Sequence, residues 1–303
     1  MKIVEPQVEL WEQKPTLEGA WHQIARATRV CYQSKPRKDE SDEAFVDRVI
    51  LKPVTREDGS IDFDKCHGAM LEHGTIYLTI PRSSFIEHTN HYAHNKYSKI
   101  IFSSLQSDTY SDCITTNMRV ILENNWQDDL KFISAPTYHA RRTTFSIITD
   151  IGVTRELNRH RVNSIAEQST RYCTYSADKF GNEITYTSNS PFLECISDDK
   201  SYFHKLCEDI ANNSYKSTWD AKHYYAFGLL AAEFAYLGLK KNKVSNDIAR
   251  QVLNLNTKSQ AIYTAFDDDW KHFIKLRADN ISGKVHPNMK IIADKIKELF
   301  NNK

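Results

Sequence analysis

The sequence lacks a CxxC pair, an excess of one charge and a long apolar run. Its 40 lysines and arginines nearly balance its 39 aspartates and glutamates, whereas a protein that coats nucleic acid usually has a clear excess of basic residues. The six cysteines, none of them in a CxxC pair, give no support to a zinc ribbon or a thioredoxin-like motif, and they suit free thiols in a reducing compartment. No apolar run approaches the roughly 20 residues of a membrane-spanning helix.

The first fifteen residues, MKIVEPQVELWEQKP, carry a charge every few positions and contain no apolar core. We therefore expect neither a signal peptide nor a membrane anchor, and we expect a soluble, cytoplasmic protein. The sequence has no repeat of solenoid length and no low-complexity tract.

Hydrophobic periodicity predicts a mixed α/β (α+β) chain, with strands early and helices late. Strands are expected at 8–11, from 75 and at 141–149. Helices are expected at 17–31, 114–125, 153–168, 218–240, 245–254, 267–276 and from 287. Thr115 or Thr116 would cap the helix at 114–125, and Ser245 would cap the one at 245–254.

A basic cluster stands out in the segment TRELNRHRVNSIAEQSTRYC, which spans residues 154–173. Guanidinium groups at such spacing repel one another unless anions lie among them, and the planar arginine fork suits phosphate or carboxylate. A solvated charged helix face is the alternative interpretation. The interspersed Val162, Ile165 and Ala166 indicate one packed face, which favours a rigid site for a phosphorylated small ligand.

The cluster also carries a known pattern. Arg159-His160-Arg161, then seven residues, then Ser169 resembles the RHR-x7-S signature of the flavin-dependent thymidylate synthases. Ser164, Glu167, Arg171 and Tyr172 are placed as in that family. The segments 27–32, 71–75, 249–253 and 276–277 resemble further blocks of the same family.

The resemblance implies a homotetramer that binds FAD at subunit junctions and methylates dUMP, with 5,10-methylenetetrahydrofolate and NADPH as co-substrates. It implies a single domain over 1–303, with a mixed sheet, a long helical layer and an insertion at about 81–140. Flavin contacts would come from His73, Thr75, Arg159, His160, Arg161, Glu167 and His272. Contacts with dUMP would come from Glu156, Arg159, Glu167, Gln168, Ser169, Thr170, Arg171, Arg250 and Arg277.

Two of these residues have more specific implied roles. Arg277 would face the uracil and favour ionisation at N3, which makes it the predicted catalytic residue. Arg250 would reach the phosphate from another subunit. Ser169 has no histidine–carboxylate relay beside it in sequence, so we interpret it as a phosphate donor rather than a nucleophile.

The sequence departs from the family pattern at one flavin-binding position. Where many members carry N-x-R, this chain reads Phe266-Asp267-Asp268. The insertion contains Asn117 and Arg119 in an N-x-R arrangement, and we propose that they supply the missing flavin contacts; an exposed helix is the alternative. His88, His91 and His94 recur every three residues, but no carboxylate or cysteine completes a ligand set, so we predict no metal.

The sequence leaves three alternative functions open. The same scaffold could form hydroxymethyl-dUMP by water attack after methylene transfer. A nucleic-acid-binding protein using the cluster from Arg155 to Arg171 is disfavoured by the near-neutral charge, and we expect no nucleic-acid partner. A flavin-binding protein without turnover is the third.

Overall fold

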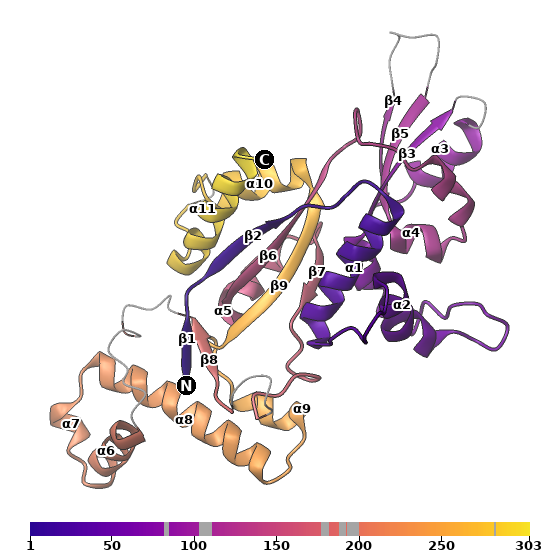
Figure 1. Ribbon diagram of the computed structural model, residues 1–303. Coiled ribbons are helices and arrows are strands. Elements are labelled where there is room, and N and C mark those ends of the chain that lie inside the picture. Colours follow the sequence, from indigo (N-terminus) through magenta and orange to yellow (C-terminus); the bar gives the residue numbers. More distant parts are fainter. Residues whose placement is uncertain (82–84, 103–110, 177–181, 188–191, 193–199, 282) are drawn as a thin grey trace.

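The computed structural model describes residues 1–81, 85–102, 111–176, 182–187, 192, 200–281 and 283–303. Its centre is a four-stranded antiparallel sheet in the order β2-β6-β9-β7 (Figure 1). The strands are β2 (Gln7–Trp11), β6 (Arg142–Asp150), β9 (Lys258–Phe266) and β7 (Ser164–Glu167). The mixed α/β class predicted from the sequence is confirmed.

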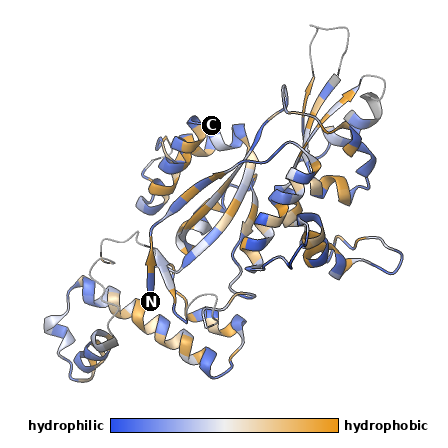
Figure 2. Ribbon diagram, viewed as in Figure 1, coloured by the Kyte–Doolittle hydropathy of each residue, from blue (hydrophilic) through white to orange (hydrophobic). Residues whose placement is uncertain are grey.

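Helices cover both faces of the central sheet. Ala261, Tyr263 and Ala265 of β9 belong to a core shared with α10 (Asp267–Arg277) and α11 (Pro287–Asn301). Ile262 points to the opposite face and joins the core beneath α1 (Leu17–Tyr32). In Figure 2, α11 alternates between hydrophobic and hydrophilic colours, as expected for a helix with one buried face.

A second, three-stranded antiparallel sheet lies at one end of the molecule, in the order β3-β5-β4 (Figure 1). Its strands are β3 (Thr75–Pro81), β5 (Ser111–Asn117) and β4 (Lys99–Phe102), with α3 (Phe85–Ala93) and α4 (Met118–Glu123) beside them. Two of the three strands and both helices come from the segment expected as an insertion. Residues of this sheet share one core with α1.

The opposite end holds a helical lobe (Figure 1). Its elements are α6 (Lys200–Ala211), α7 (Tyr215–Thr218), α8 (Ala221–Lys241) and α9 (Asn246–Ala249), and β1 (Lys2–Val4) pairs in parallel with β8 (Thr185–Thr187) next to them. Two other α-helices are α2 (Asp42–Val46) and α5 (Ile151–Leu157), and α2 continues as a π-helix over Asp47–Leu51. Short 3-10 turns lie at Lys52–Val54, Gly68–His73, Gln127–Phe132 and Arg250–Val252. No helix among the described residues is long and apolar enough to cross a membrane.

Local chemistry explains the elements that the sequence predicted well. Thr16 caps α1 by accepting a hydrogen bond from the backbone N–H of Gly19 at 3.0 Å. Asp220 caps α8 through the N–H groups of Lys222 and His223. Pro287 occupies the first turn of α11, where no donor is needed.

The predicted helix at 153–168 is wrong. α5 ends at Leu157, a turn covers 158–163, and residues 164–167 form β7. Ser164 pairs with Thr264 and Glu167 with Ala261, so pairing with β9 overrides the local helical pattern. The basic residues therefore lie on a turn rather than on a helix face.

Two predicted helices differ from the structure, and one strand was not predicted. Residues 114–117 belong to β5, and Asn117 rather than a threonine caps α4 by accepting from the N–H of Val120 at 3.1 Å. The helix expected at 245–254 is α9 plus one 3-10 turn, and Ser245 makes no side-chain cap. The helical last third contains β9, which was missed because its residues 261–266 are buried on both faces and do not alternate in polarity.

Candidate functional site

A cleft of about 650 Å³ opens between the end of β7, the α9 region and the start of β9. It brings together sequence-distant residues predicted to bind one nucleotide. The lining includes Glu167, Gln168, Ser169, Thr170 and Arg171 from one segment and Arg250 from another, with Arg155, Lys258 and Ser259 among the rest. Arg250 Nη1 lies 3.5 Å from Thr170 Oγ1, so the two groups meet within one chain, whereas the resemblance implied that Arg250 comes from another subunit.

Strand pairing fixes the first two residues of the cleft segment. The Oε1 atom of Glu167 accepts a hydrogen bond from Ser259 Oγ at 2.7 Å. Gln168 is buried, its backbone N–H donates to Gln260 O at 2.8 Å, and its side-chain Oε1 accepts from Lys258 Nζ at 2.9 Å. Because β9 holds both side chains from behind, the segment enters the cleft with a defined orientation.

A tight turn presents the next three residues. Ser169 Oγ accepts from the backbone N–H groups of Arg171, at 3.2 Å, and Tyr172, at 3.4 Å, and its own N–H donates to Cys31 O at 3.0 Å. Since Oγ already accepts two hydrogen bonds, its hydrogen is directed to another acceptor. This agrees with the interpretation of Ser169 as a donor. Arg171 Nε donates to Asp247 Oδ1 at 2.9 Å, which steadies a largely exposed guanidinium.

The turn between α5 and β7 carries the arginines of the RHR motif on the surface. Arg159 and Arg161 are exposed. No described carboxylate forms an ion pair with either guanidinium. The turn itself is held by hydrogen bonds from the N–H of Arg159 to Glu156 O at 3.2 Å and from the N–H of His160 to Leu157 O at 3.0 Å. The two cations are therefore held on an ordered backbone and available to an anion.

His160 faces inward and meets Arg277 at the end of α10. Arg277 Nε donates to His160 Nε2 at 3.3 Å, and Arg277 Nη1 lies 3.8 Å from Glu156 Oε2. Burial, then the charges of Arg277 and His272, lower the pKa of His160 to about 4. The imidazole is therefore neutral at neutral pH and acts as an acceptor. His272 is itself exposed on α10.

A third group of predicted residues lies at the start of β3. His73 is completely buried, and its Nδ1 atom is 2.8 Å from Thr264 Oγ1; burial first, and the charge of Arg142 second, lower its pKa to about 3. Thr75 forms two backbone hydrogen bonds with the side chain of Gln13 and lines a separate cavity of about 830 Å³. His73 and Thr75 thus do not line the 650 Å³ cleft of the same chain.

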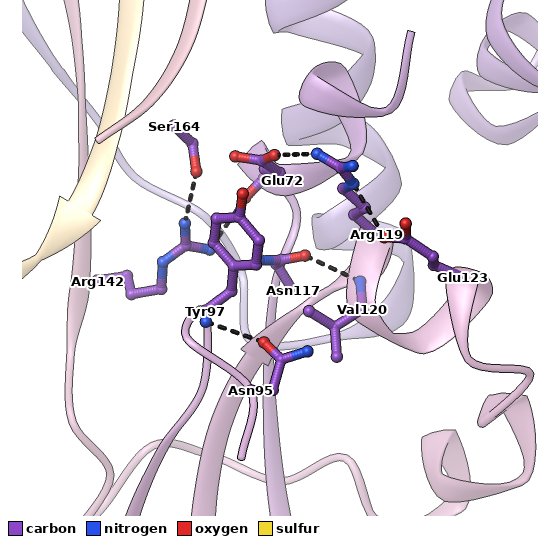
Figure 3. Close-up of polar contacts among 9 residues, drawn as sticks. All are labelled: Glu72, Asn95, Tyr97, Asn117, Arg119, Val120, Glu123, Arg142 and Ser164. Atoms are coloured by element: carbon purple, nitrogen blue, oxygen red, sulfur yellow. Dashed lines mark hydrogen bonds and ion pairs between the residues drawn. The ribbon is translucent and has the colours of Figure 1, made fainter. Parts of the chain in front are cut away.

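Arg119 and Asn117 already have protein partners (Figure 3). Arg119 Nη1 lies 2.6 Å from Oε1 of the buried Glu72, and its Nε donates to Glu123 at 3.0 Å. Asn117 is fully buried and caps α4. The N-x-R pair therefore occupies the inner side of the insertion, next to the segment that carries His73 and Thr75.

Sequence reasoning missed Arg142, which joins three elements (Figure 3). Its Nη1 donates to Glu72 O at 3.0 Å and to Thr75 Oγ1 at 3.3 Å, and its Nη2 donates to Ser164 Oγ at 3.2 Å. Burial lowers the pKa of Arg142 to about 10. The signal in the sequence was a charged residue opening a strand that is otherwise buried. Arg142 links the start of β3 to the residue that follows the RHR turn.

Among the described residues, no group of three or more His, Cys, Asp and Glu side chains could hold a metal ion. Two of the regularly spaced histidines have other partners. His88 Nδ1 lies 3.0 Å from Asp129 Oδ1, and His91 stacks on Trp126 with ring centroids 4.8 Å apart.

Comparisons with known proteins agree with the motif. The family model described as thymidylate synthase complementing protein matches residues 134–303, which is more than half of the chain. Similar solved structures include a UMP/dUMP methylase PolB from Streptomyces cacaoi bound with 5-Br dUMP, at 15% identity and a TM-score of 0.40, covering 100% of this chain and 93% of that chain. Another is Thymidylate Synthase X from Helicobacter pylori with FAD and dUMP, at 16% identity and a TM-score of 0.38, covering 97% and 92%.

Likeness at such TM-scores carries no conclusion about function. No curated protein is similar enough to this chain to count as a match. The assignment rests on the family model, whose match includes the RHR turn, the cleft segment and Arg277. This chain therefore belongs to the thymidylate synthase complementing protein family, the family of the flavin-dependent thymidylate synthases.

Proposed function

We propose that this chain methylates dUMP to dTMP, with 5,10-methylenetetrahydrofolate as the carbon donor and NADPH-reduced FAD as the hydride donor. The observation that carries this proposal is the cleft in which the segment 167–171 meets Arg250. Family membership supports the same reading.

The cleft suits a nucleoside monophosphate. Arg171, Arg250 and the hydroxyl groups of Ser169 and Thr170 are donors of the kind that surround a phosphate. Glu167 and Gln168 provide acceptors and an amide for sugar hydroxyls. The positive charge is local to this cleft and the adjacent turn, in a chain whose net charge is only +1, so a small anion fits better than a long polyanion.

The residues present also fit FAD. Arg159 and Arg161 are exposed cations on an ordered turn, without a described carboxylate partner, and a dinucleotide pyrophosphate would supply the missing anion. We propose that His160, Glu167, His272 and Thr75 complete the flavin site, with Arg119 contributing from the insertion. His73 and Asn117 are fully buried, so we propose that they support this site from beneath rather than contact the flavin. Reduced FAD supplies a hydride when it is bound.

Arg277 is the proposed catalytic residue. A guanidinium beside N3 stabilises the uracil anion, which raises the electron density at C5, where the new carbon is attached. The Nε atom of Arg277 is bound to His160, and Glu156 lies near its Nη1 atom, which leaves the remaining guanidinium donors available to the substrate. Because the bond to His160 needs a neutral imidazole, the lowered pKa of His160 preserves this geometry at neutral pH.

We further propose that a homotetramer brings the three groups of residues together. The nucleotide cleft, the RHR turn with Arg277, and the start of β3 line different surfaces of one chain. Sharing a site between subunits would join them without rearranging the fold. We also propose that residues 1–303 form one domain with an insertion and that the protein is cytoplasmic.

Mass analysis of the nucleotide product tests the function. The purified chain is incubated with dUMP, FAD, NADPH and 5,10-methylenetetrahydrofolate, and dTMP is the expected product. Hydroxymethyl-dUMP would instead identify water attack on the same scaffold. Flavin that is reduced and reoxidised while dUMP stays unchanged would indicate a flavoprotein without this activity, and steeply salt-dependent binding of DNA or RNA alone would indicate a nucleic-acid-binding protein.

A further inference from the structure

Lys258 lies in the wall of the nucleotide cleft, and the family motif does not account for it. It is the first residue of β9, follows the turn that closes the cleft, and has a partly buried side chain. Its Nζ atom donates to Oε1 of the buried Gln168 at 2.9 Å. The ammonium group is therefore held next to the segment 169–171 that is proposed to bind phosphate.

The charge of Lys258 has no anionic partner in the described part of the chain. Its hydrogen-bond acceptor is a neutral amide, whereas Lys303, whose side chain is 26% exposed, contacts Asp267 Oδ2 at 2.7 Å. Removing an ammonium from water without a counter-charge is costly. Burial accordingly lowers the pKa of Lys258 to about 8.

The titratable groups around Lys258 give it no ion pair among the described residues. After burial, Cys173 has the next largest effect and raises the pKa of Lys258, whereas Lys2 adds a second positive charge that lowers it. Burial raises the pKa of the Cys31 thiol to about 11, so that thiol stays neutral at neutral pH. Glu167 is a carboxylate in the cleft wall, but it accepts from Ser259 and forms no ion pair with Lys258. The lysine would orient Gln168 equally well as a neutral donor, so that role does not explain a cation here.

We propose that Lys258 is a further substrate-binding residue, whose ammonium group binds the phosphate of the nucleotide together with Arg171 and Arg250. The inference rests on the proposed function, because it takes a nucleoside monophosphate as the ligand of this cleft. A dianionic phosphate supplies the counter-charge that the described residues do not. Three cations from separate elements would then surround one phosphate.

The test compares Lys258→Met with Lys258→Arg, and uses Lys295→Met as the matched control. Lys295 is also partly buried and donates to a single neutral acceptor, Pro6 O at 2.9 Å, but it lies on α11 outside the cleft. Calorimetric titrations use dUMP and deoxyuridine, which differ only by the phosphate. The Kd for dUMP should rise about 10- to 100-fold in Lys258→Met and stay within about threefold in Lys258→Arg and in the control.

The Kd for deoxyuridine should not change in any of the variants. An equal loss for dUMP and deoxyuridine would move the contact to the nucleoside and overturn the proposal. Unchanged dUMP affinity in Lys258→Met would also overturn it, while leaving the proposed function intact. If the wild-type chain does not bind dUMP at all, the proposed function fails, and inorganic phosphate then serves as the probe. Phosphate binding that is equal in wild type and Lys258→Met rejects the role of Lys258.

Proton uptake gives a second readout. An anion beside the ammonium raises the pKa of Lys258, so dUMP binding at pH 8 should be accompanied by proton uptake. Affinity should then weaken as the pH rises above about 8. Titrations in buffers of different ionisation enthalpy measure the uptake, which should disappear in Lys258→Arg because arginine stays protonated. Uptake that persists in that variant contradicts the proposal.

Discussion

Arg277 Nε donates a hydrogen bond to His160 Nε2 over 3.3 Å, and this bond joins the last residue of α10 to the middle residue of the RHR turn. The ring of His160 also packs edge-on against Phe273, with centroids 4.9 Å apart. Two parts of the chain that are 117 positions apart thus form one unit. The predicted catalytic arginine is held by the predicted flavin-binding motif.

Replacing Arg277 by Met should lower kcat about 10²- to 10³-fold, because the substitution removes the cation that stabilises the uracil anion. Steady-state kinetics with bound flavin quantified by absorbance would measure this effect. Lys275→Met, an exposed position on the same helix, is the control and should retain normal kcat. A normal kcat in Arg277→Met would exclude the catalytic role.

Two of the histidines with lowered pKa values, His73 and His160, should make the fold acid-sensitive. His160 and His73 have folded-state pKa values of about 4 and 3, below the unfolded value of 6.5, so the unfolded chain binds more protons as the pH falls below 6.5. The free energy of unfolding should therefore decrease on acidification, by at most about 1.4 kcal/mol per pH unit for each histidine.

Urea unfolding between pH 7 and pH 4.5 would measure this dependence. His160→Gln should show a shallower loss of stability than wild type, because the glutamine does not titrate. His204→Gln, at an exposed position on α6, should leave the slope unchanged. Stability that stays constant over this range would argue against buried neutral histidines.

The sequence predicted the elements whose signals are local. The amphipathic pattern of α1, the proline at the start of α11 and the short strand β2 were all predicted from the sequence. β7 and β9 were missed because their pairing is tertiary: the segment 164–167 becomes a strand only opposite β9, and β9 is buried on both faces. Long-range pairing of this kind leaves little trace in residue order.

The candidate site was predictable where one motif carries it. The RHR pattern led to the segment 167–171 and, through the later blocks, to Arg250 and Arg277. Arg142 and Lys258 were not predicted, because each stands alone in sequence and gains its role from partners more than 20 residues away or from burial. The pairing of Arg119 with Glu72 likewise depends on two elements that are 47 residues apart.

Replacing Arg119 by Met should destabilise the fold by about 3 kcal/mol, because the substitution leaves the carboxylate of Glu72 buried without its partner. The double variant Glu72→Gln with Arg119→Met should recover part of this loss. Urea unfolding measures both values. FAD titration of the double variant separates the two roles of Arg119: weakened binding supports a flavin contact, whereas wild-type affinity would leave Arg119 with a structural role only.

Replacing Arg142 by Met should also destabilise the fold, because three hydrogen-bond acceptors, in β3, β7 and the turn before β3, lose their shared donor. We expect the free energy of unfolding to fall by about 2–4 kcal/mol. The affinity for FAD should weaken more than the affinity for dUMP, since Thr75 and the RHR turn lie on the proposed flavin side. Arg37→Met, at an exposed position outside both cavities, is the control and should change neither quantity. If the affinities for FAD and dUMP weakened equally in Arg142→Met, the cause would be a general loosening of the sheet. An unchanged free energy of unfolding would mean that water replaces the guanidinium without penalty.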